Sequence, residues 1–421
     1  MSVPTLPRKA LYARNSTTLV RELEVITQMR VIVIGAGIGG LAAALTLGRS
    51  GFEVQVFEQA TELREIGAGV QISPNATRIL HRLGLEEPLR RFGVRPREVV
   101  IRRWDDGRVL ARQPLADACE RNFGAPYYHF HRPELLDVLS ATVPDGVLHL
   151  DHRCVGLTQH GDRVEVQFHN GATADADVVV GADGIHSTVR EAILGPESPR
   201  FSGHIAYRGL VPAARVAHLG MEVVASLWWG PNHHFVPYFV GAGARYLNWV
   251  AVTPGEWRLE SWTTRGEVAD ALKEFEGWHP EVRDIIGSAD MTNRWALYDR
   301  DPLPRWTIGR VTLMGDAAHA MLPYMAQGAV QSIEDAAVLA KCLERANAND
   351  ADGALLRYEQ TRKPRASRCQ EGSRRNGIMY HLADGEDQRE RDANLASATT
   401  APLPQNAWLY GHDVEAEFEQ R

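Results

Sequence analysis

The sequence predicts an α/β protein in which a Rossmann-type nucleotide-binding domain carries an inserted, mostly antiparallel sheet. Three observations predict this architecture. A glycine-rich turn joins a β-branched run to an apolar helix, two later apolar runs each end in glycine and aspartate, and an aromatic segment lies between those runs. The 421 residues suffice for roughly two to four domains, or for one large fold with an inserted lobe.

Composition and charge narrow the classes of function. Apolar residues make up 44% of the chain and charged residues 24%, which argues against disorder, collagen-like repeats and a coiled coil. A net charge of −7 favours small molecules over nucleic acid as partners. The four cysteines lie far apart and no histidines cluster at ligand spacing, so we expect neither a disulfide framework nor a metal site.

Hydropathy along the chain bears on where the protein is found. No apolar run reaches the roughly 20 residues that cross a bilayer, so we expect no membrane partner. Residues 1–28 lack an apolar segment followed by a small-residue cleavage site, and we expect them to form a tail of unassigned role. These features predict a cytoplasmic protein.

The first predicted strand covers residues 31–34, a β-branched run suited to a parallel sheet buried on both faces. The glycines of the G-x-G-x-x-G motif that follows are Gly35, Gly37 and Gly40. They precede a helix predicted over 41–49, an order that lets a pyrophosphate approach the first N–H groups of the helix. The second strand, 54–57, ends at Glu58, whose carboxylate can accept hydrogen bonds from a ribose, so the site suits FAD or NAD better than NADP.

Two later strands, within 176–190 and 311–319, run into Gly-Asp or Gly-Ala-Asp, which places Asp183 and Asp316 just beyond their ends. Carboxyl ends of parallel strands meet at one edge of a sheet, so we expect both carboxylates near the first glycine turn. For Asp183 an alternative stays open, because it could cap the helix expected to begin near Ser187.

The three motifs, in this order and spacing, resemble those of the class A flavoprotein aromatic hydroxylases, single-component FAD monooxygenases of the para-hydroxybenzoate hydroxylase fold. The resemblance covers most of the chain, from about residue 29 to 413. It implies FAD as cofactor, NADH or NADPH as cosubstrate, and a Rossmann-type FAD-binding domain with an inserted substrate domain. The expected segments are an FAD-binding part at 29–200, a substrate-binding sheet lobe at 201–300, a return to the FAD-binding domain with its helices at 301–382, and a C-terminal segment at 383–421.

The resemblance also assigns cofactor contacts. It implies that Asp316 contacts the ribityl or ribose region of FAD, and that the segment from Asp183 to Arg190 serves FAD and, transiently, NAD(P)H. Arg132 resembles an arginine that contacts the pyrophosphate, which a guanidinium pairs with well; the alternative is a surface arginine at a helix start. Backbone N–H groups of Gly328 and Ala329 would stabilise negative charge on the reduced flavin, unless they only begin a packed helix.

Aromatic and β-branched residues dominate residues 201–300, which predicts a sheet that roofs an aromatic pocket. On its predicted strand, His234 and Tyr238 share a face, and we expect them side by side. In relatives acting on 6-hydroxynicotinate or hydroxybenzoates, a histidine and a tyrosine at matching positions contact the substrate. Because attack on the ring needs a ring oxyanion, His234 is the candidate base, with Tyr238 and Tyr324 as partners. The alternative is that His234 and Tyr238 are ordinary sheet residues.

Further substrate contacts are expected from Gln71, Arg208 and Pro323. The 6-hydroxynicotinate group carries histidines where this chain has Gln71 and Tyr324, so the identity of the aromatic substrate stays open. Arg208 could pair with a substrate carboxylate, lie against the flavin, or form an interdomain salt bridge. His319 is expected to be structural or flavin-adjacent rather than catalytic.

The C-terminal quarter adds no expected chemistry. Residues 358–379 are strongly basic and predict a solvated helix that crosses the flavin domain, in preference to a nucleic-acid site. Residues 383–405 predict a loose connection, and 408–413 a segment that docks back on the fold.

Together these features predict an FAD-dependent monooxygenase that uses NAD(P)H and O2 to hydroxylate a small hydroxybenzoate, salicylate or hydroxynicotinate type of acid. The resemblance implies that oxygen adds at flavin C4a and that its distal atom passes to a ring carbon ortho or para to an oxyanion, in some relatives with loss of a carboxylate. Two alternatives stay open: a flavin oxidase or reductase on the same scaffold, and a non-enzymatic FAD-binding protein. We expect a monomer or a homodimer.

Overall fold

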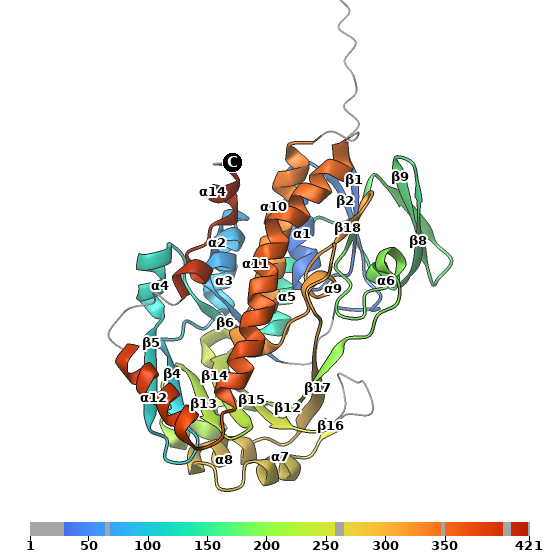
Figure 1. Ribbon diagram of the computed structural model, residues 1–421. Helices are drawn as coiled ribbons and strands as arrows, with labels where there is room; N and C mark the ends of the chain where they lie inside the picture. Colours follow the sequence, from blue (N-terminus) through green and yellow to red (C-terminus); the bar gives the residue numbers. More distant parts are fainter. Residues whose placement is uncertain (1–28, 64–67, 257–264, 347–349, 399–405, 420–421) are drawn as a thin grey trace, which may run out of the picture.

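A computed structural model describes residues 29–63, 68–256, 265–346, 350–398 and 406–419 (Figure 1). The tail expected at 1–28 lies outside these residues. Within the described part, a nucleotide-binding region and a sheet lobe are joined along the length of one long helix.

The nucleotide-binding region is built on a six-stranded sheet. In spatial order its strands are β18 (Thr307–Ile308), β19 (Val311–Leu313), β11 (Val178–Gly181), β1 (Arg30–Ile34), β2 (Glu53–Phe57) and β7 (Leu148–His149). All neighbours pair in parallel except β18, which is antiparallel to β19. The strands of the three sequence motifs, β1, β11 and β19, are adjacent, so their carboxyl ends meet at one edge, as predicted.

This sheet is buried because apolar elements cover it. Every residue of β11 is buried, as expected for a strand of a covered parallel sheet. Around it lie the helices α1 (Ile38–Arg49), α2 (Pro74–Arg82), α3 (Glu86–Phe92), α5 (Arg132–Ser140), α6 (Thr188–Leu194), α9 (Asp316–His319) and α10 (Gly328–Glu344). A small sheet of β8 (Cys154–His160), β9 (Arg163–Phe168) and β10 (Thr173–Ala176) adds Val164 and Val166 to the same core. The pair β3 (Gly69–Ile72) and β6 (Tyr128–His131) leads to the second region.

The sheet lobe has eight strands. In spatial order they are β16 (Arg265–Gly266), β17 (Thr292–Asp299), β12 (Arg200–Pro212), β15 (Tyr246–Pro254), β14 (His233–Val240), β13 (Ala225–Gly230), β4 (Glu98–Arg103) and β5 (Val109–Pro114). The pairing is antiparallel except between β13 and β4. The expected insertion at 201–300 therefore supplies six strands, and two come from 98–114. The β-branched run in β4 pairs with the edge of β13, which would otherwise expose unpaired backbone groups.

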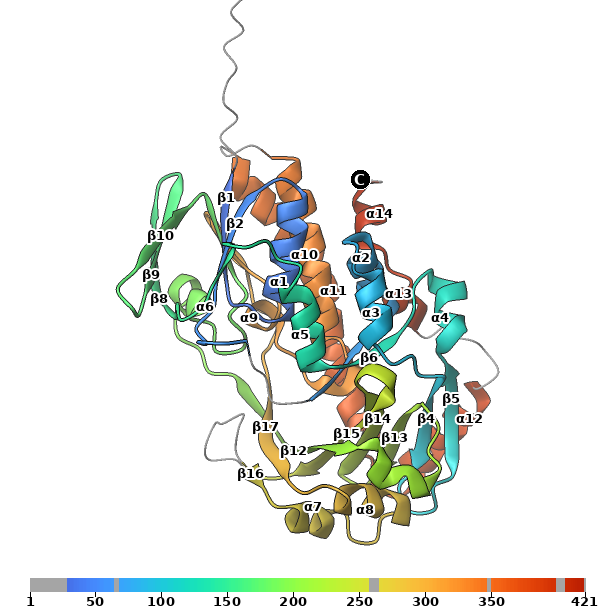
Figure 2. The ribbon, with the colours of Figure 1, turned by 180° about the vertical axis from the view of Figure 1, so that it is seen from behind.

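Alternation of side chains gives this sheet two distinct faces. Trp228, Phe235 and Trp249 point to the face that packs on α7 (Val268–Glu274) and α8 (Pro280–Gly287), at the base of the molecule in Figure 2. Their strand neighbours Trp229 and His234 point to the other face. That face meets the 3-10 turn η3 (Pro323–Met325) and the C-terminal end of α11 (Ala351–Tyr380).

Helix α11 connects the two regions (Figure 1). The expected solvated helix is wrong for Arg362, which is 1% exposed and pairs with Glu334 and Asp335 of α10, each at 2.7 Å. Arg365 also pairs with Glu334, at 2.7 Å. Two buried carboxylates on α10 require a cation, and α11 is the element that faces them.

The C-terminal segment is more ordered than expected. Residues 386–398 form α12 (Glu386–Ala398), which packs beside β5, so the predicted loose connection is wrong there. Arg391 of this helix lies over the ring of Trp229, 5.3 Å from its centroid. The remaining helices are α4 (Ala116–Phe123), α13 (Ala407–Tyr410) and α14 (Val414–Glu419), with 3-10 turns η1 (Ala213–Leu219) and η2 (Ala242–Ala244). Among the described helices, none is long and apolar enough to cross a membrane.

Candidate active site

The glycine turn between β1 and α1 has the geometry of an anion site. Gly35 has a left-handed φ of 103°, and a Cβ there would lie 2.5 Å from the carbonyl oxygen of Ala182. A Cβ on Gly40 would lie 1.9 Å from the Gly35 oxygen. Gly37, the N-cap of α1, differs, because among the described residues no atom lies within 4 Å of its virtual Cβ and no side chain caps the helix. The positive end of this twelve-residue helix is therefore open to a phosphate.

Glu58 follows β2 and reaches back to this turn. Its Oε2 accepts a hydrogen bond from the backbone nitrogen of Ala36 at 2.7 Å, and its Oε1 accepts one from Ala60 at 2.9 Å. The side chain stays partly exposed. The carboxylate thus braces the turn and still has lone pairs for the hydroxyls of a ribose.

Asp316 is the first residue of α9, which follows β19. The residue is open to solvent, but many protein atoms surround its carboxylate, and this desolvation is the largest influence on its pKa, which it raises. The charges of His319 and Arg132, the latter being the first residue of α5, act on it in the opposite direction. A Cβ on Gly328 would lie 3.8 Å from Asp316 Oδ1. Arg132, Asp316 and Gly328 therefore border one space at the edge of the sheet.

These groups fit the chemistry of FAD. The open start of α1 and the guanidinium of Arg132 complement a pyrophosphate, and the carboxylates of Glu58 and Asp316 complement sugar and ribityl hydroxyls. The start of α1, Glu58 and Asp316 lie at the carboxyl ends of the parallel strands or on the elements that follow them. Arg132 begins α5 directly after β6, which pairs antiparallel with β3 in the separate two-stranded sheet. Their contacts with FAD stay predictions.

Asp183 takes the capping role that the sequence left as an alternative. Its Oδ1 accepts a hydrogen bond from the Ser187 hydroxyl at 2.5 Å, and its Oδ2 accepts one from the Val189 nitrogen at 3.1 Å. Burial raises the pKa of Asp183, and these hydrogen bonds oppose that effect. The residue holds the start of α6 against the β1 turn, where its Cα lies 3.1 Å from the virtual Cβ of Gly35. A direct contact of Asp183 with FAD stays a prediction.

The loop between α9 and α10 brings the two regions together. Pro323 is exposed, Tyr324 is buried, and Ala326 has a left-handed φ of 52°. Helix α10 then begins at Gly328 with no side-chain cap, and Gly328 and Ala329 stay partly exposed. Their N–H groups are thus available to a ligand, as the predicted stabilisation of a flavin anion requires.

Buried polar atoms without a hydrogen-bond partner among the described residues occur at the face of the lobe sheet that carries His234; they include Trp229 Nε1, Tyr324 Oη and Asn248 Nδ2. Tyr324 is 6% exposed and Asn248 is fully buried. An unpaired buried donor costs about 1–3 kcal/mol, so each marks a point where a ligand atom would restore a hydrogen bond. Asn248 was not among the residues expected at the site, although a single amide in the apolar run Tyr246–Pro254 could have indicated it.

His234 and Tyr238 lie on one face of β14 but in different surroundings. The His234 ring lies 5.1 Å from the Tyr324 ring, and its Nδ1 lies 2.7 Å from His381 Nε2. Tyr238 instead packs on His129, with centroids 4.7 Å apart. We expected from the sequence that the two side chains would lie side by side. Residues four apart on a strand are separated by roughly 13 Å, so this expectation is wrong.

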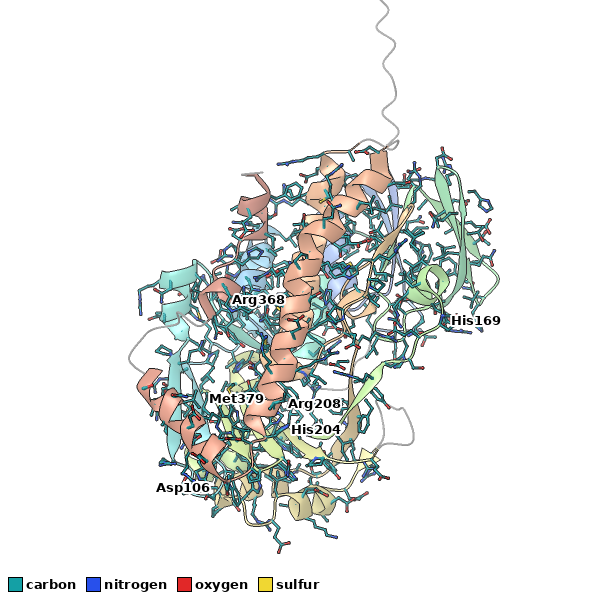
Figure 3. All side chains as sticks on the ribbon, viewed as in Figure 1. Asp106, His169, His204, Arg208, Arg368 and Met379 are labelled. Carbon is teal, nitrogen blue, oxygen red and sulfur yellow. The ribbon has the colours of Figure 1, made fainter. Side chains whose placement is uncertain are left out.

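Gln71 and Arg208 flank Tyr238. The hydroxyl of Tyr127 donates to Gln71 Oε1 at 2.6 Å. Burial raises the pKa of Tyr238 to about 12, while Arg208 and a hydrogen bond with Gln71 oppose the rise. The Arg208 guanidinium lies 4.3 Å from the centroid of the Trp295 ring. Figure 3 labels Arg208 next to His204. This face of the lobe sheet therefore has a cationic part near Arg208 and an imidazole and phenol part near His234.

His319 belongs to a buried network rather than to the face of the lobe sheet that carries His234 and Arg208. Its Nε2 lies 2.6 Å from Asp335 Oδ2, which also accepts a hydrogen bond from the Gly315 nitrogen at 2.9 Å. Glu334, the neighbour of Asp335, accepts one from Asn75 Nδ2 at 2.6 Å. The network ties the strand end that carries Asp316 to α10, which supports the structural role expected for His319.

Comparisons with known proteins agree with this geometry. A family model described as an FAD binding domain matches residues 28–373. The chain is 44% identical to the 3-amino-4-hydroxybenzoate 2-monooxygenase PtmB3 of Streptomyces platensis over 91% of this chain and 96% of that protein. It is 39% identical to a 6-hydroxynicotinate 3-monooxygenase of Pseudomonas fluorescens over 91% and 95% of the two chains. A solved salicylate hydroxylase substrate complex superposes with a TM-score of 0.80 at 29% identity, covering 93% of this chain and 97% of that one.

Proposed function

The chain belongs to the family of FAD-dependent aromatic monooxygenases, and from this premise we propose that it hydroxylates a small aromatic acid bearing a ring hydroxyl or an equivalent ring oxygen. The cosubstrates in this proposal are NADH or NADPH and O2. The flavin oxidase considered from the sequence is not favoured, because the similar proteins are named as monooxygenases.

One observation carries the choice of substrate class. The hydroxyl of Tyr324 is buried without a partner among the described residues, and its ring lies 5.1 Å from the ring of His234. A substrate hydroxyl at this point would accept a hydrogen bond from the phenol of Tyr324 and donate one to the imidazole of His234. No apolar ligand would satisfy the Tyr324 hydroxyl, so the site favours a ring that carries oxygen.

Other residues at this face of the sheet would bind the remaining polar groups of the substrate. Arg208 supplies the cation for a substrate carboxylate, and the Asn248 amide supplies a donor on the same sheet face. Gln71, fixed by Tyr127, presents its amide nitrogen towards Tyr238. The 6-hydroxynicotinate group has histidines in place of Gln71 and Tyr324, so we propose a substrate of the hydroxybenzoate or aminohydroxybenzoate type for this chain.

In the reaction, the side chains act on the substrate, while bound FAD supplies the redox chemistry that no side chain can supply. His234 takes the proton of the ring hydroxyl, and the resulting oxyanion enriches the ring in electrons ortho and para to it. Tyr324 stabilises that oxyanion by donating its hydrogen bond. The apolar groups Trp229, Val252 and Leu322 form a buried cluster at this face and exclude water.

The test is turnover by the purified protein with FAD. The panel is 3-amino-4-hydroxybenzoate, 3-hydroxybenzoate, 4-hydroxybenzoate, salicylate and 6-hydroxynicotinate, each assayed for NADH and NADPH consumption. At least one acid should stimulate consumption and yield a product that carries one atom from labelled O2. Peroxide formation without NAD(P)H would support the oxidase instead, and no stimulation by any acid would overturn the proposed substrate class.

A further inference from the structure

Three histidines from distant parts of the chain form a row that begins at the substrate pocket: His234 on β14, His381 directly after α11, and His204 on β12. His234 Nδ1 lies 2.7 Å from His381 Nε2, and the two rings are stacked with centroids 4.9 Å apart. The His381 and His204 rings follow at 4.5 Å. We call these three residues the histidine row.

Exposure increases along the histidine row. His234 is 3% exposed and His381 is 9% exposed, while His204 is half-buried and reaches solvent. Figure 3 labels His204 on β12, below Arg208 and close to the end of α11, where Met379 lies. The row therefore runs from the closed side of the lobe towards the outside.

Backbone contacts fix the middle member of the row. The carbonyl oxygen of His381 accepts a hydrogen bond from the Asn232 nitrogen at 3.0 Å, and its own nitrogen donates to the Gly377 oxygen at 3.3 Å. The preceding residue, Tyr380, stacks on Trp229 with centroids 4.4 Å apart. These contacts hold the end of α11 against the hairpin of β13 and β14. They therefore fix the position of His381 at 2.7 Å from His234.

We propose that the histidine row is the path by which the proton of the substrate hydroxyl leaves the pocket for solvent. This inference rests on the proposed function. The ring hydroxyl gives its proton to His234, His234 gives its Nδ1 proton to His381 Nε2, and His381 gives the proton on its other nitrogen to His204 or to water beside it. The substrate becomes an oxyanion, each imidazole ends neutral in its other tautomer, and one proton reaches solvent.

The surroundings of His234 explain why a path is needed. Burial, and then the neighbouring imidazoles of His381, His204 and His233, hold the pKa of His234 well below its usual range. Burial likewise lowers the pKa of His381 to about 3. An imidazole that cannot keep a proton is a poor final acceptor, but a neutral one can accept at one nitrogen while donating at the other. Among the described residues, the phenols Tyr324 and Tyr380 also contact the His234 ring, and they stay neutral near pH 7 because burial raises the pKa of each.

The experiment measures proton release on substrate binding by the FAD-loaded protein without NAD(P)H. The protein is mixed rapidly with 3-amino-4-hydroxybenzoate in weakly buffered solution containing a pH indicator. The methoxy analogue 3-amino-4-methoxybenzoate, which has no ionisable hydroxyl, reports any proton released by other groups. The variants are His381→Gln and His381→Phe. Glutamine keeps a hydrogen bond to His234 but cannot pass a proton between two nitrogens, so a purely structural role would leave it close to native.

We expect the native protein to release a proton with the hydroxy acid only. Both variants should slow that release by about 100-fold, the lower end of what a positioned acid–base group contributes. A third variant, His381→Ala, should release the proton as slowly, and added imidazole should restore its rate because the smaller side chain leaves space for it. The matched control is His233→Gln, because His233 is the adjacent histidine on the opposite face, 3.5 Å from Glu274, and it should release at the native rate.

The outcomes separate this inference from the proposed function. Native release rates in His381→Gln would overturn the path, as would the absence of release from native protein with an acid that it hydroxylates. If none of the panel acids is hydroxylated but the proton still leaves through His381, the proposed function fails while the path stands.

Discussion

The Oε2 atom of Glu58 lies 2.7 Å from the backbone nitrogen of Ala36, so the carboxylate at the end of β2 is joined to the glycine turn that follows β1. The same side chain was expected from the sequence to bind a ribose. In the fold it has two tasks, because it holds the phosphate turn in shape and presents lone pairs to the sugar. Its removal should therefore weaken cofactor binding through both.

Replacing Glu58 by alanine should release FAD. Losing a charged hydrogen-bond acceptor costs about 1.5–3 kcal/mol, which corresponds to an increase in the Kd for FAD of roughly 10- to 100-fold. Flavin absorbance after dialysis and fluorescence titration of the apoprotein measure it. Glu53→Ala, at the exposed start of the same strand, is the control and should keep its yellow colour. Full flavin retention in Glu58→Ala would contradict the ribose assignment.

Replacing Tyr324 by phenylalanine should weaken substrate binding without cost to stability. The Tyr324 hydroxyl has no partner among the described residues, so its loss should leave the free energy of unfolding unchanged or higher, while KM rises by roughly fivefold for about 1 kcal/mol of lost hydrogen bonding. Tyr380→Phe is the matched control. Its hydroxyl donates to the Tyr324 carbonyl oxygen at 2.8 Å, so that variant should lose about 1 kcal/mol in urea unfolding.

Replacing Arg208 by methionine should affect acids more than neutral phenols. If the guanidinium pairs with a substrate carboxylate, KM for the aromatic acid should rise roughly 10- to 100-fold, whereas the phenol lacking the carboxylate should bind as before. Arg215→Met, an exposed arginine paired with Asp290, serves as the control. An equal loss for the acid and the phenol would instead assign Arg208 to the flavin or to interdomain contact.

Replacing Arg362 by methionine should be the most destabilising of these changes. The side chain is buried between Glu334 and Asp335, each 2.7 Å away, so its removal leaves buried carboxylates poorly compensated and should cost about 3–5 kcal/mol. Arg357→Met, whose ion pair with Asp350 is exposed, should change stability by less than about 1 kcal/mol. Urea unfolding of both variants measures the difference, and similar small losses would show that the buried network is energetically unimportant.

Stability should fall as the pH falls below about 6.5, because buried histidines stay neutral in the folded protein. Burial lowers the pKa of His129 to about 3, so between pH 6.5 and 3 the unfolded chain takes up a proton that the folded protein does not. The free energy of unfolding should drop by about 1.4 kcal/mol per pH unit for each such histidine. In His129→Phe the slope between pH 6 and about 4.5 should decrease by that amount, and in His169→Phe, an exposed histidine (Figure 3), it should not.

The nucleotide-binding half could be predicted from the sequence because its signals are local. A buried strand, the Gly35 turn and a helix lie within twenty residues, and the motifs ending at Asp183 and Asp316 follow the same pattern. Parallel strands of this kind collect at one edge, and β1, β11 and β19 are neighbours in the sheet. Alternation along β14 also placed His234 on the same face as Tyr238.

Other features depend on which surfaces meet. In the sequence, Arg362 is one of several basic residues in a segment expected to face solvent. It is buried only because α11 packs on α10. Nothing near residue 381 indicates a link to the pocket, since His381 and His234 are 147 residues apart. The sequence of β4 likewise does not indicate that this strand pairs with β13.

The sequence by itself determined the fold class and the order of the motifs, since each rests on short runs whose glycines and periodicity act locally. The choice of FAD over NAD came from the resemblance of the three motifs to those of the flavoprotein hydroxylases. The tertiary structure alone decided the burial of Arg362, the partners of His234 and the composition of the lobe sheet. Burial and hydrogen bonding between distant residues are properties of the surfaces that pack together, and no local period encodes them.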